Sequence, residues 1–174
     1  CSNNLAPTSS TTAQLVMGDA LAVCLQDLRG FSSKDFAKYH PGGALGKRLY
    51  LRVSDLIKNN QTPTVDIDSS IAKVIVEISE KRLGATAVLE NKKLVGIITD
   101  GDIRRMLTKT TDINHFTAKD IMGKDPKTVS QDAMAIEALE KLERDSITQI
   151  LVVDAHGNYA GVVHLHDLIK EGIF

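Results

Sequence analysis

The sequence predicts an α/β (α+β) fold in which one unit of strands and helices occurs twice about a pseudo-twofold axis, preceded by a helical segment. The main observation is a repeat. Residues 96–103 (Gly-Ile-Ile-Thr-Asp-Gly-Asp-Ile) return in altered form at residues 161–168 (Gly-Val-Val-His-Leu-His-Asp-Leu), an offset of 65 residues. The openings of the two units, residues 53–57 and 118–122, have the same offset. Only two copies exist, so the repeat is a duplicated unit rather than a solenoid.

The first fifty residues form a segment of a different kind. Residues 13–26 are apolar at nearly every position, which predicts a helix buried on all sides. About fifty residues hide too little surface to bury such a helix, so its partners are expected upstream of this sequence. The hydroxyl residues 9–12 are candidate N-caps or a phosphate cradle, and capping is preferred. Gly30 is expected to end this region.

The two cysteines, Cys1 and Cys24, do not form a metal-binding pair. Cys24 lies in the apolar run, where a reduced thiol in a core is expected. A chain that starts with Cys is either a processed lipoprotein, anchored through that residue, or a fragment of a longer protein. The apolar helix favours the fragment.

A short helix after a capping box at residues 32–35 leads to the run His40-Pro41-Gly42-Gly43. Pro41 disfavours a helical backbone at His40, and the two glycines allow a sharp turn. The imidazole of His40 is therefore expected on a loop. A loop histidine is usually exposed or capping, and an acid–base role needs further support.

The first repeat is predicted from its apolar pattern. A strand begins near Thr64, and a helix capped within residues 68–70 carries an apolar stripe. Gly84 ends that helix. Strands at residues 85–89 and 94–98 flank a turn at residues 91–92, and a helix follows over residues 101–107. Members of the stripe are spaced i, i+3, i+4, i+7: Ile71, Val74, Ile75 and Ile78.

The second repeat follows a polar linker at residues 108–117 and has the same order of elements. A cap is predicted at Ser130, followed by a helix and by strands at residues 149–153 and 159–163 around a longer turn. The apolar stripe of this helix consists of Ala135, Ala138, Leu139 and Leu142. Each unit is too small to bury both faces of its sheet, so the two units are expected to pack as one domain.

Composition excludes several classes of function. The net charge of −1 provides no long-range attraction to nucleic acid or to an anionic membrane. Aromatic residues make up 4% of the chain and tryptophan is absent, which argues against a base-stacking surface for single strands. No apolar run reaches membrane-spanning length. We therefore expect no nucleic-acid partner and no membrane partner.

The run Gly-Ile-Ile-Thr-Asp-Gly-Asp at residues 96–102 resembles the motif of the CBS domain, a paired nucleotide-sensing module. In that family the hydroxyl and the carboxylate of the motif often hold phosphate and ribose. The resemblance implies a tandem CBS pair, with repeats at residues 53–110 and 118–174. The second copy has His164 where Thr or Ser is expected, which weakens the same inference there.

The packing of the two units is expected to open clefts between them, and by the resemblance one or two of these clefts bind a nucleotide. In the first, Thr64 is placed for a base contact, Thr99, Asp100 and Asp102 suit ribose and phosphate, and Arg104 and Arg105 serve as anion partners. In the second, His164, His166 and Asp167 are expected to converge. Two histidines and a carboxylate can ligate a metal, but a strand end and a helix start should direct His164 and His166 apart. We therefore expect polar cleft lining and no metal, and capping of helix starts is the structural alternative for Asp102 and Asp167.

Three runs in the first fifty residues, at 5–12, 16–22 and 40–46, resemble the end of the sugar-isomerase (SIS) domain of bacterial arabinose-5-phosphate isomerases, in which a CBS pair follows. The resemblance covers essentially the whole chain and implies that residues 1–50 are the C-terminal remnant of that domain. It implies interconversion of D-ribulose 5-phosphate and D-arabinose 5-phosphate, with His40 at the catalytic site and no required cofactor. The other site residues lie upstream in that family, so this chain alone is expected to be inactive.

The family makes a precursor of Kdo, an acidic sugar of lipopolysaccharide or capsule. The nucleotide sugar CMP-Kdo is therefore the expected effector of the CBS pair, and a cytoplasmic homotetramer is expected. Two alternatives remain open. One is a stand-alone adenylate-binding CBS module of another enzyme or transporter. The other is a pair that has lost its ligand and only supports oligomerisation.

Overall fold

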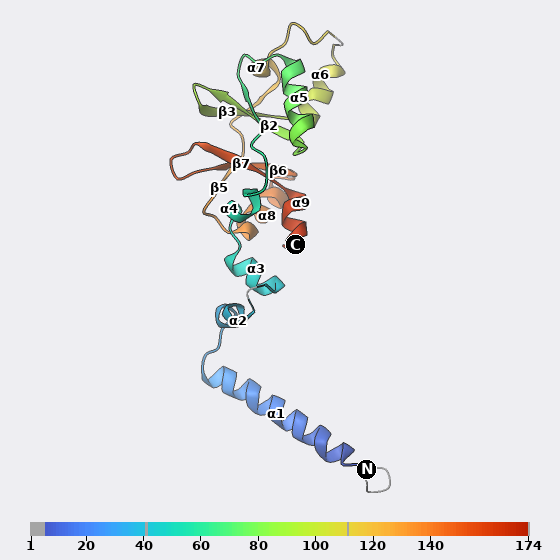
Figure 1. The fold of residues 1–174 in the computed structure, drawn as a ribbon, viewed down its shortest axis with the longest axis vertical. Coiled ribbons are helices and arrows are strands. Elements are labelled where there is room, and N and C mark those ends of the chain that lie inside the picture. Colours follow the sequence, from blue (N-terminus) through green and yellow to red (C-terminus); the bar gives the residue numbers. More distant parts are fainter. Residues whose placement is uncertain (1–5, 41, 111, 174) are drawn as a thin grey trace. The chain divides into compact units, whose positions relative to one another are not determined.

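The computed structural model describes residues 6–40, 42–110 and 112–173 (Figure 1). The chain forms two compact units, residues 1–46 and residues 47–174. The first is helical. The second contains both predicted repeats and two β-sheets.

Helix α1 (Thr8–Leu28) is exposed along its whole length. It begins before the predicted caps, because Pro7 is the N-cap and no side chain caps the helix. The prediction of N-caps at residues 9–12 is therefore wrong. The hydroxyls of Thr11 and Thr12 instead donate to the carbonyl oxygens of Pro7 (2.7 Å) and Thr8 (2.9 Å), one turn earlier. Cys24 is also exposed. Among the described residues its thiol therefore does not lie in a core, contrary to the expectation from the sequence.

Helix α1 ends where the sequence predicts. Gly30 has a positive φ of 61°, and the N–H of Phe31 donates to the carbonyl of Gln26 (3.0 Å), which closes the helix. Helix α2 (Ser33–Tyr39) has the predicted capping box between Ser32 and Asp35. Helix α3 (Ala44–Tyr50) follows. In the part of the chain that is described, no helix is long and apolar enough to cross a membrane.

Two sheets form the centre of residues 47–174. In each, a short first strand runs parallel to the second strand, which pairs antiparallel with the third. The first sheet consists of β1 (Thr64–Asp66), β2 (Ala85–Glu90), β3 (Lys93–Thr99) and β4 (Gly123–Lys124). The second consists of β5 (Thr128–Ser130), β6 (Gln149–Val153) and β7 (Tyr159–His164). The predicted strands are thus present, and β4 was not foreseen.

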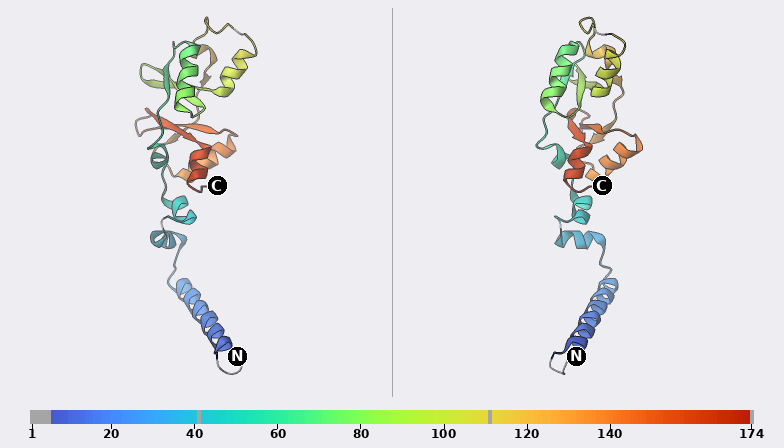
Figure 2. Two further views of the ribbon diagram at one scale, coloured as in Figure 1. Left: turned by 45° about the vertical axis from the view of Figure 1, so that its right-hand side comes forward. Right: turned by 90° about the vertical axis from the view of Figure 1, so that its right-hand side faces the viewer.

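Helices cover the outer faces of both sheets (Figures 1 and 2). Helices α5 (Ile71–Lys81) and α6 (Asp100–Leu107) belong to the first sheet. Helices α8 (Ala135–Arg144) and α9 (Leu165–Lys170) belong to the second. The predicted stripes lie inward: Ala135, Ala138, Leu139 and Leu142 are buried, as are Ile71, Val74 and Ile78. Between the sheets, Ala87, Leu151 and Val162 form a shared apolar layer.

Of the helix caps predicted for the two repeats, one is present and the other is not. Ser70 caps α5 within the predicted range. Ser130 does not cap α8, because the helix begins five residues later. Its N-cap is Met134, whose N–H donates to the carboxylate of Glu137 (3.0 Å). The hydroxyl of Ser130 instead accepts from the N–H of Asp132 (3.2 Å) within the preceding turn.

The two repeats exchange their opening helices. Helix α4 (Val53–Ile57), which opens the first repeat in sequence, places Val53 and Leu56 in the core of the second sheet and its helices. Helix α7 (Ala118–Ile121), which opens the second repeat, places Ala118 in the core of the first sheet. Equivalent backbone bonds hold both. The N–H of Val53 donates to Ala133, and that of Ala118 donates to Ser69.

In the third strand of each repeat, a glycine leaves the space into which the exchanged segment packs. A Cβ at Gly96 would lie 2.6 Å from the sulfur of Met122, directly after α7. A Cβ at Gly161 would lie 3.4 Å from the Cδ1 of Ile57, the last residue of α4. Both pairs are related by the 65-residue offset. The glycine of the repeated motif is thus the place where the opening segment of the other repeat packs.

Candidate functional site

The first repeated motif places a hydroxyl and a carboxylate at the junction of β3 and α6. The side chains of Thr99 and Asp102 bond to each other. The Oγ1 of Thr99 donates to Asp102 Oδ2 (2.6 Å), and the Thr99 N–H donates to the same oxygen (2.8 Å). This is a capping box, in which each residue satisfies the other. Asp102 therefore closes the start of α6, which is the capping alternative considered from sequence.

A cleft of about 320 Å³ opens beside this junction and is shared by both repeats. The first repeat contributes the residue before β2, the end of β3 and the start of α6, and the second contributes the turn before β6 and the first residue of β6. The lining residues are Gly84, Thr99, Asp100, Gly101, Arg104, Ser146, Ile147, Thr148 and Gln149. Hydroxyls, an amide, a carboxylate and a guanidinium thus meet in one cleft. Such a set can bind a polar ligand that carries an anionic group.

Clefts between the two units were predicted from the sequence, but Thr148 and Gln149, which line this cleft from the second repeat, were not. Thr148 and Gln149 occupy the positions that Gly84 and Ala85 occupy in the first repeat, directly before and at the start of the second strand. The side chain of Gln149 approaches Gly84 so closely that a Cβ there would lie 2.7 Å from its Nε2. The signal was available in the duplication, because a cleft lined by one copy of this junction faces the other copy.

The two predicted arginines are divided between different cavities. Arg104 lines the shared cleft, and its Nε donates to the carbonyl of Asp100 (3.2 Å). Arg105 pairs with Asp102 (2.6 Å). It lines a second cavity of about 270 Å³, together with Lys109 and Phe116. The single group of anion partners expected from the sequence is therefore split between two faces of α6.

Thr64 does not line the shared cleft. It is the first residue of β1, and its N–H donates to the carboxylate of Glu77 (3.0 Å). The hydroxyl of Tyr159, from the second sheet, donates to the carbonyl of the neighbouring Pro63 (3.1 Å). Burial, together with the charge of Glu77, raises the pKa of the Tyr159 hydroxyl, so it remains a donor at neutral pH.

The second motif brings its two histidines together, contrary to the expected divergence. The rings of His164 and His166 stack, with centroids 4.9 Å apart and planes inclined by 15°. The backbone N–H of His166 donates to His164 Nδ1 (3.0 Å), so His164 caps α9. Burial lowers the pKa of His164, and the charge of His166 lowers it further. Among the described residues, no group of three His, Cys, Asp or Glu side chains is arranged to hold a metal ion.

Asp167 accepts hydrogen bonds from its own repeat and from the exchanged segment. Its Oδ2 accepts from the N–H of His164 (3.0 Å) and from the side-chain amide of Asn60 (2.9 Å), which follows α4. Asp167 and Asn60 border a cavity of about 190 Å³. Its lining is Asp55, Leu56, Asn59, Asn60, Asp167, Lys170 and Glu171. Asn60 was not predicted, since nothing in the sequence shows that the opening segment packs against the other repeat.

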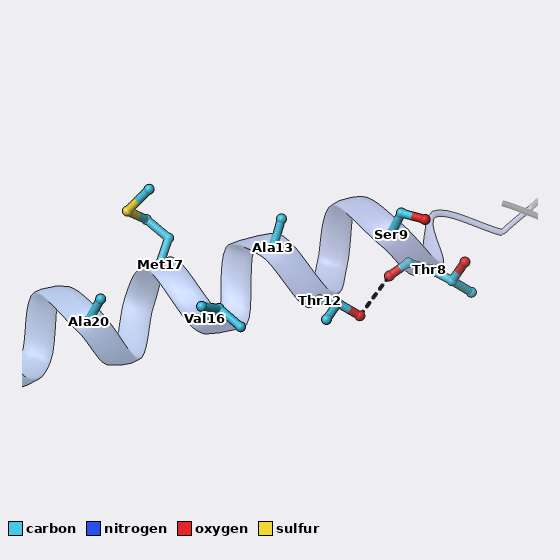
Figure 3. Close-up of a pocket in the computed structure, with 7 residues that line it drawn as sticks. All are labelled: Thr8, Ser9, Thr12, Ala13, Val16, Met17 and Ala20. Atoms are coloured by element: carbon cyan, nitrogen blue, oxygen red, sulfur yellow. Dashed lines mark hydrogen bonds between the residues drawn. The ribbon is translucent and has the colours of Figure 1, made fainter.

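The first unit carries His40 at the C-terminal end of α2. The side chain is exposed and its ring lies beside that of Phe36, with centroids 4.8 Å apart. Its backbone is not helical, as Pro41 predicts, although Pro41 itself lies outside the described residues. Helix α1 bears an open groove on one face (Figure 3), lined by Thr8, Ser9, Thr12, Ala13, Val16, Met17 and Ala20. The hydroxyl of Thr12 donates to the carbonyl of Thr8 in the same helix, which argues against a phosphate cradle.

A family model described as CBS domain matches residues 53–109 and 118–173. The chain is also similar to curated proteins named arabinose 5-phosphate isomerase KdsD. It is 50% identical over 171 residues to that of Francisella tularensis, a match covering 98% of this chain and 52% of the relative. It is 45% identical over 175 residues to that of Pseudomonas aeruginosa, covering 99% and 54%. The chain thus spans about half the length of the curated relatives it matches.

Solved structures share the fold of the second unit. A CBS domain protein from Pyrobaculum aerophilum, complexed with AMP, matches with a TM-score of 0.62 and 26% identity over 68% of this chain and 90% of that one. A CBS domain protein of unknown function from Thermoplasma acidophilum matches with a TM-score of 0.61 and 20% identity, covering 69% of this chain and 68% of that one. The matched fold is the tandem arrangement predicted from the repeat.

Proposed function

The chain belongs to the CBS domain family, and from this premise we propose that its CBS pair is the regulatory module of an arabinose 5-phosphate isomerase. The observation that carries the proposal is the 50% identity to a protein of that name over 98% of this chain. The match therefore extends through residues 1–46, which no CBS repeat includes. A stand-alone CBS module would not explain the similarity of that helical segment.

The proposed reaction interconverts D-ribulose 5-phosphate and D-arabinose 5-phosphate. A proton moves between C1 and C2 through an enediol, so the reaction needs a base, an acid and stabilisation of the developing oxyanion. His40 suits the acid–base role, since imidazole exchanges protons near neutral pH. The remaining groups would come from the part of the isomerase that this chain does not span. The proposal implies a cytoplasmic sugar-phosphate enzyme, assembled as a homotetramer.

The proposed effector is a nucleotide sugar, CMP-Kdo, bound in the shared cleft. The guanidinium of Arg104 would meet a phosphate or carboxylate, and the hydroxyls and the amide of Thr148 and Gln149 would meet sugar oxygens. The relative from Pyrobaculum aerophilum is complexed with AMP, which supports a nucleotide as the class of ligand. That complex also supports the second candidate function, an adenylate-binding module.

A thermal-shift panel distinguishes these ligands. The chain is melted with CMP-Kdo, CMP, AMP or ATP up to millimolar concentration, since a ligand that binds only the folded state raises Tm. We expect CMP-Kdo to raise Tm and Arg104→Gln to abolish the rise, while Arg29→Gln, outside the cleft, leaves it unchanged. A rise with adenylates alone would favour the second candidate. Absence of any shift would contradict a sensor and leave a structural role.

The isomerase itself is tested on the full-length protein that contains this chain. Formation of D-arabinose 5-phosphate from D-ribulose 5-phosphate should fall about 100-fold or more in His40→Gln, the usual contribution of a general acid or base. His115→Gln removes an exposed histidine of the linker and should have little effect. Residues 1–174 alone should show no turnover. An unchanged rate in His40→Gln would contradict the assigned role.

A further inference from the structure

The segment that connects α3 to the first repeat is bound to the second repeat. The N–H of Ala135, at the start of α8, donates to the carbonyl of Leu51 (2.8 Å). The N–H of Ser54 donates to the carbonyl of Gln131 (2.9 Å). Together with the burial of Val53 beside α8 and β7, these bonds fix residues 51–54 to the half of the module that is later in sequence.

An ion pair extends this attachment into α3. The ammonium of Lys47 lies 2.7 Å from the carboxylate of Glu171, the residue that ends α9. Lys47 stands one helical turn before Leu51, whose N–H donates to the Lys47 carbonyl (2.9 Å). The pair thus adds a contact with the second repeat one helical turn closer in sequence to His40. Both side chains are partly exposed, so the pair contributes little stability and its effect is mainly positional.

Glu171 also belongs to the cavity beside α9. The lining of this cavity includes Asp167 and Lys170, from the same helix, and Asn60 from the exchanged segment. A molecule that enters the cavity meets the carboxylate that holds Lys47. Glu171 thus contributes both to the lining of this cavity and to the attachment of α3.

We propose that the Lys47–Glu171 ion pair makes the second repeat the part of the sensor that controls the segment carrying His40. The connection is direct along the chain, because α3 (Ala44–Tyr50) contains Lys47 and begins four residues after His40. This inference rests on the proposed function. It adds which repeat acts on the isomerase and through which contact.

The experiment uses the full-length protein and four variants: Lys47→Gln, Glu171→Gln, the exchange K47E/E171K, and Arg144→Gln as a control. Arg144 forms an ion pair with Asp145 at the C-terminal end of α8. Amide hydrogen exchange is measured across residues 44–51. Each single variant should accelerate exchange about two- to fivefold, the range for a partly exposed pair. The charge exchange should restore slow exchange, and the control should leave it unchanged.

The second readout is the response of the isomerase rate to CMP-Kdo and to AMP. The single variants should lose most of the response and the charge exchange should regain it. If the wild-type protein shows no isomerase activity, the proposed function fails. The hydrogen-exchange rates still test whether the Lys47–Glu171 pair fixes α3 to the second repeat. Wild-type exchange rates in both single variants, or no recovery in K47E/E171K, would overturn it.

Discussion

His164 occupies the place in the second repeat that Thr99 occupies in the first. Both cap the following helix, and in both a carboxylate three residues later accepts from the backbone N–H of the cap. The acceptor atom differs, because Thr99 caps through a hydroxyl and His164 through an imidazole nitrogen. Only the imidazole loses its acceptor when it binds a proton.

The histidine cap should make stability depend on pH. Burial lowers the pKa of His164 below its ordinary value, so the unfolded chain binds this proton more readily. The contribution of His164 is therefore fully present above the unfolded pKa of about 6.5 and is lost as the pH falls towards the folded pKa. The Tm of residues 1–174 should drop more between pH 8 and pH 5.5 than that of His164→Thr, which keeps a cap but no imidazole. Parallel pH profiles would refute this account.

At the scale of elements, the exchange of α4 and α7 links the two halves more firmly than sheet packing alone. Each core contains residues of both repeats, and each exchanged segment packs over a glycine of the partner repeat. The motif glycine therefore has a role in packing that is separate from ligand binding.

The packing of Met122 against Gly96 can be tested with Gly96→Ala. The added methyl would meet the sulfur of Met122 at 2.6 Å and the carbonyl oxygen of Gly123 at 3.0 Å. Overpacking of this kind costs about 1–3 kcal/mol of the free energy of unfolding, measured by denaturant titration. In the Met122→Ala background the cost should be smaller, since one of the two clashes is gone. Gly18→Ala, whose Cβ would meet open space on α1, should cost nothing. Equal costs in both backgrounds would show that Met122 does not press on Gly96.

Local patterns predicted the elements well. The i, i+3, i+4, i+7 stripe identified α5, and the pair Asn91-Lys92, both with positive φ, formed the expected tight hairpin. The exchange was not predictable, because Ile57 and Met122 are apolar residues that would suit the core of either repeat. The lining of the shared cleft was predicted only in part: Thr99, Asp100 and Arg104 line it, while Thr148 and Gln149 follow only if the duplicated junction is taken to face its copy.

At the scale of the whole molecule, the exchange predicts that neither half folds alone. A fragment of residues 47–110 lacks α7 and β4, and a fragment of residues 111–174 lacks α4. Each would leave apolar surface of its sheet uncovered. We expect each fragment to melt without a cooperative transition by circular dichroism, and an equimolar mixture to regain the single transition of residues 47–174. Cooperative melting of either fragment alone would contradict the exchange as the basis of stability.

The crossed opening segments also bear on the origin of the fold. A single copy with this packing could complete its hydrophobic core only with the opening segment of a second, identical copy. Covalent linkage of two such copies makes this association intramolecular, so that it no longer depends on protein concentration.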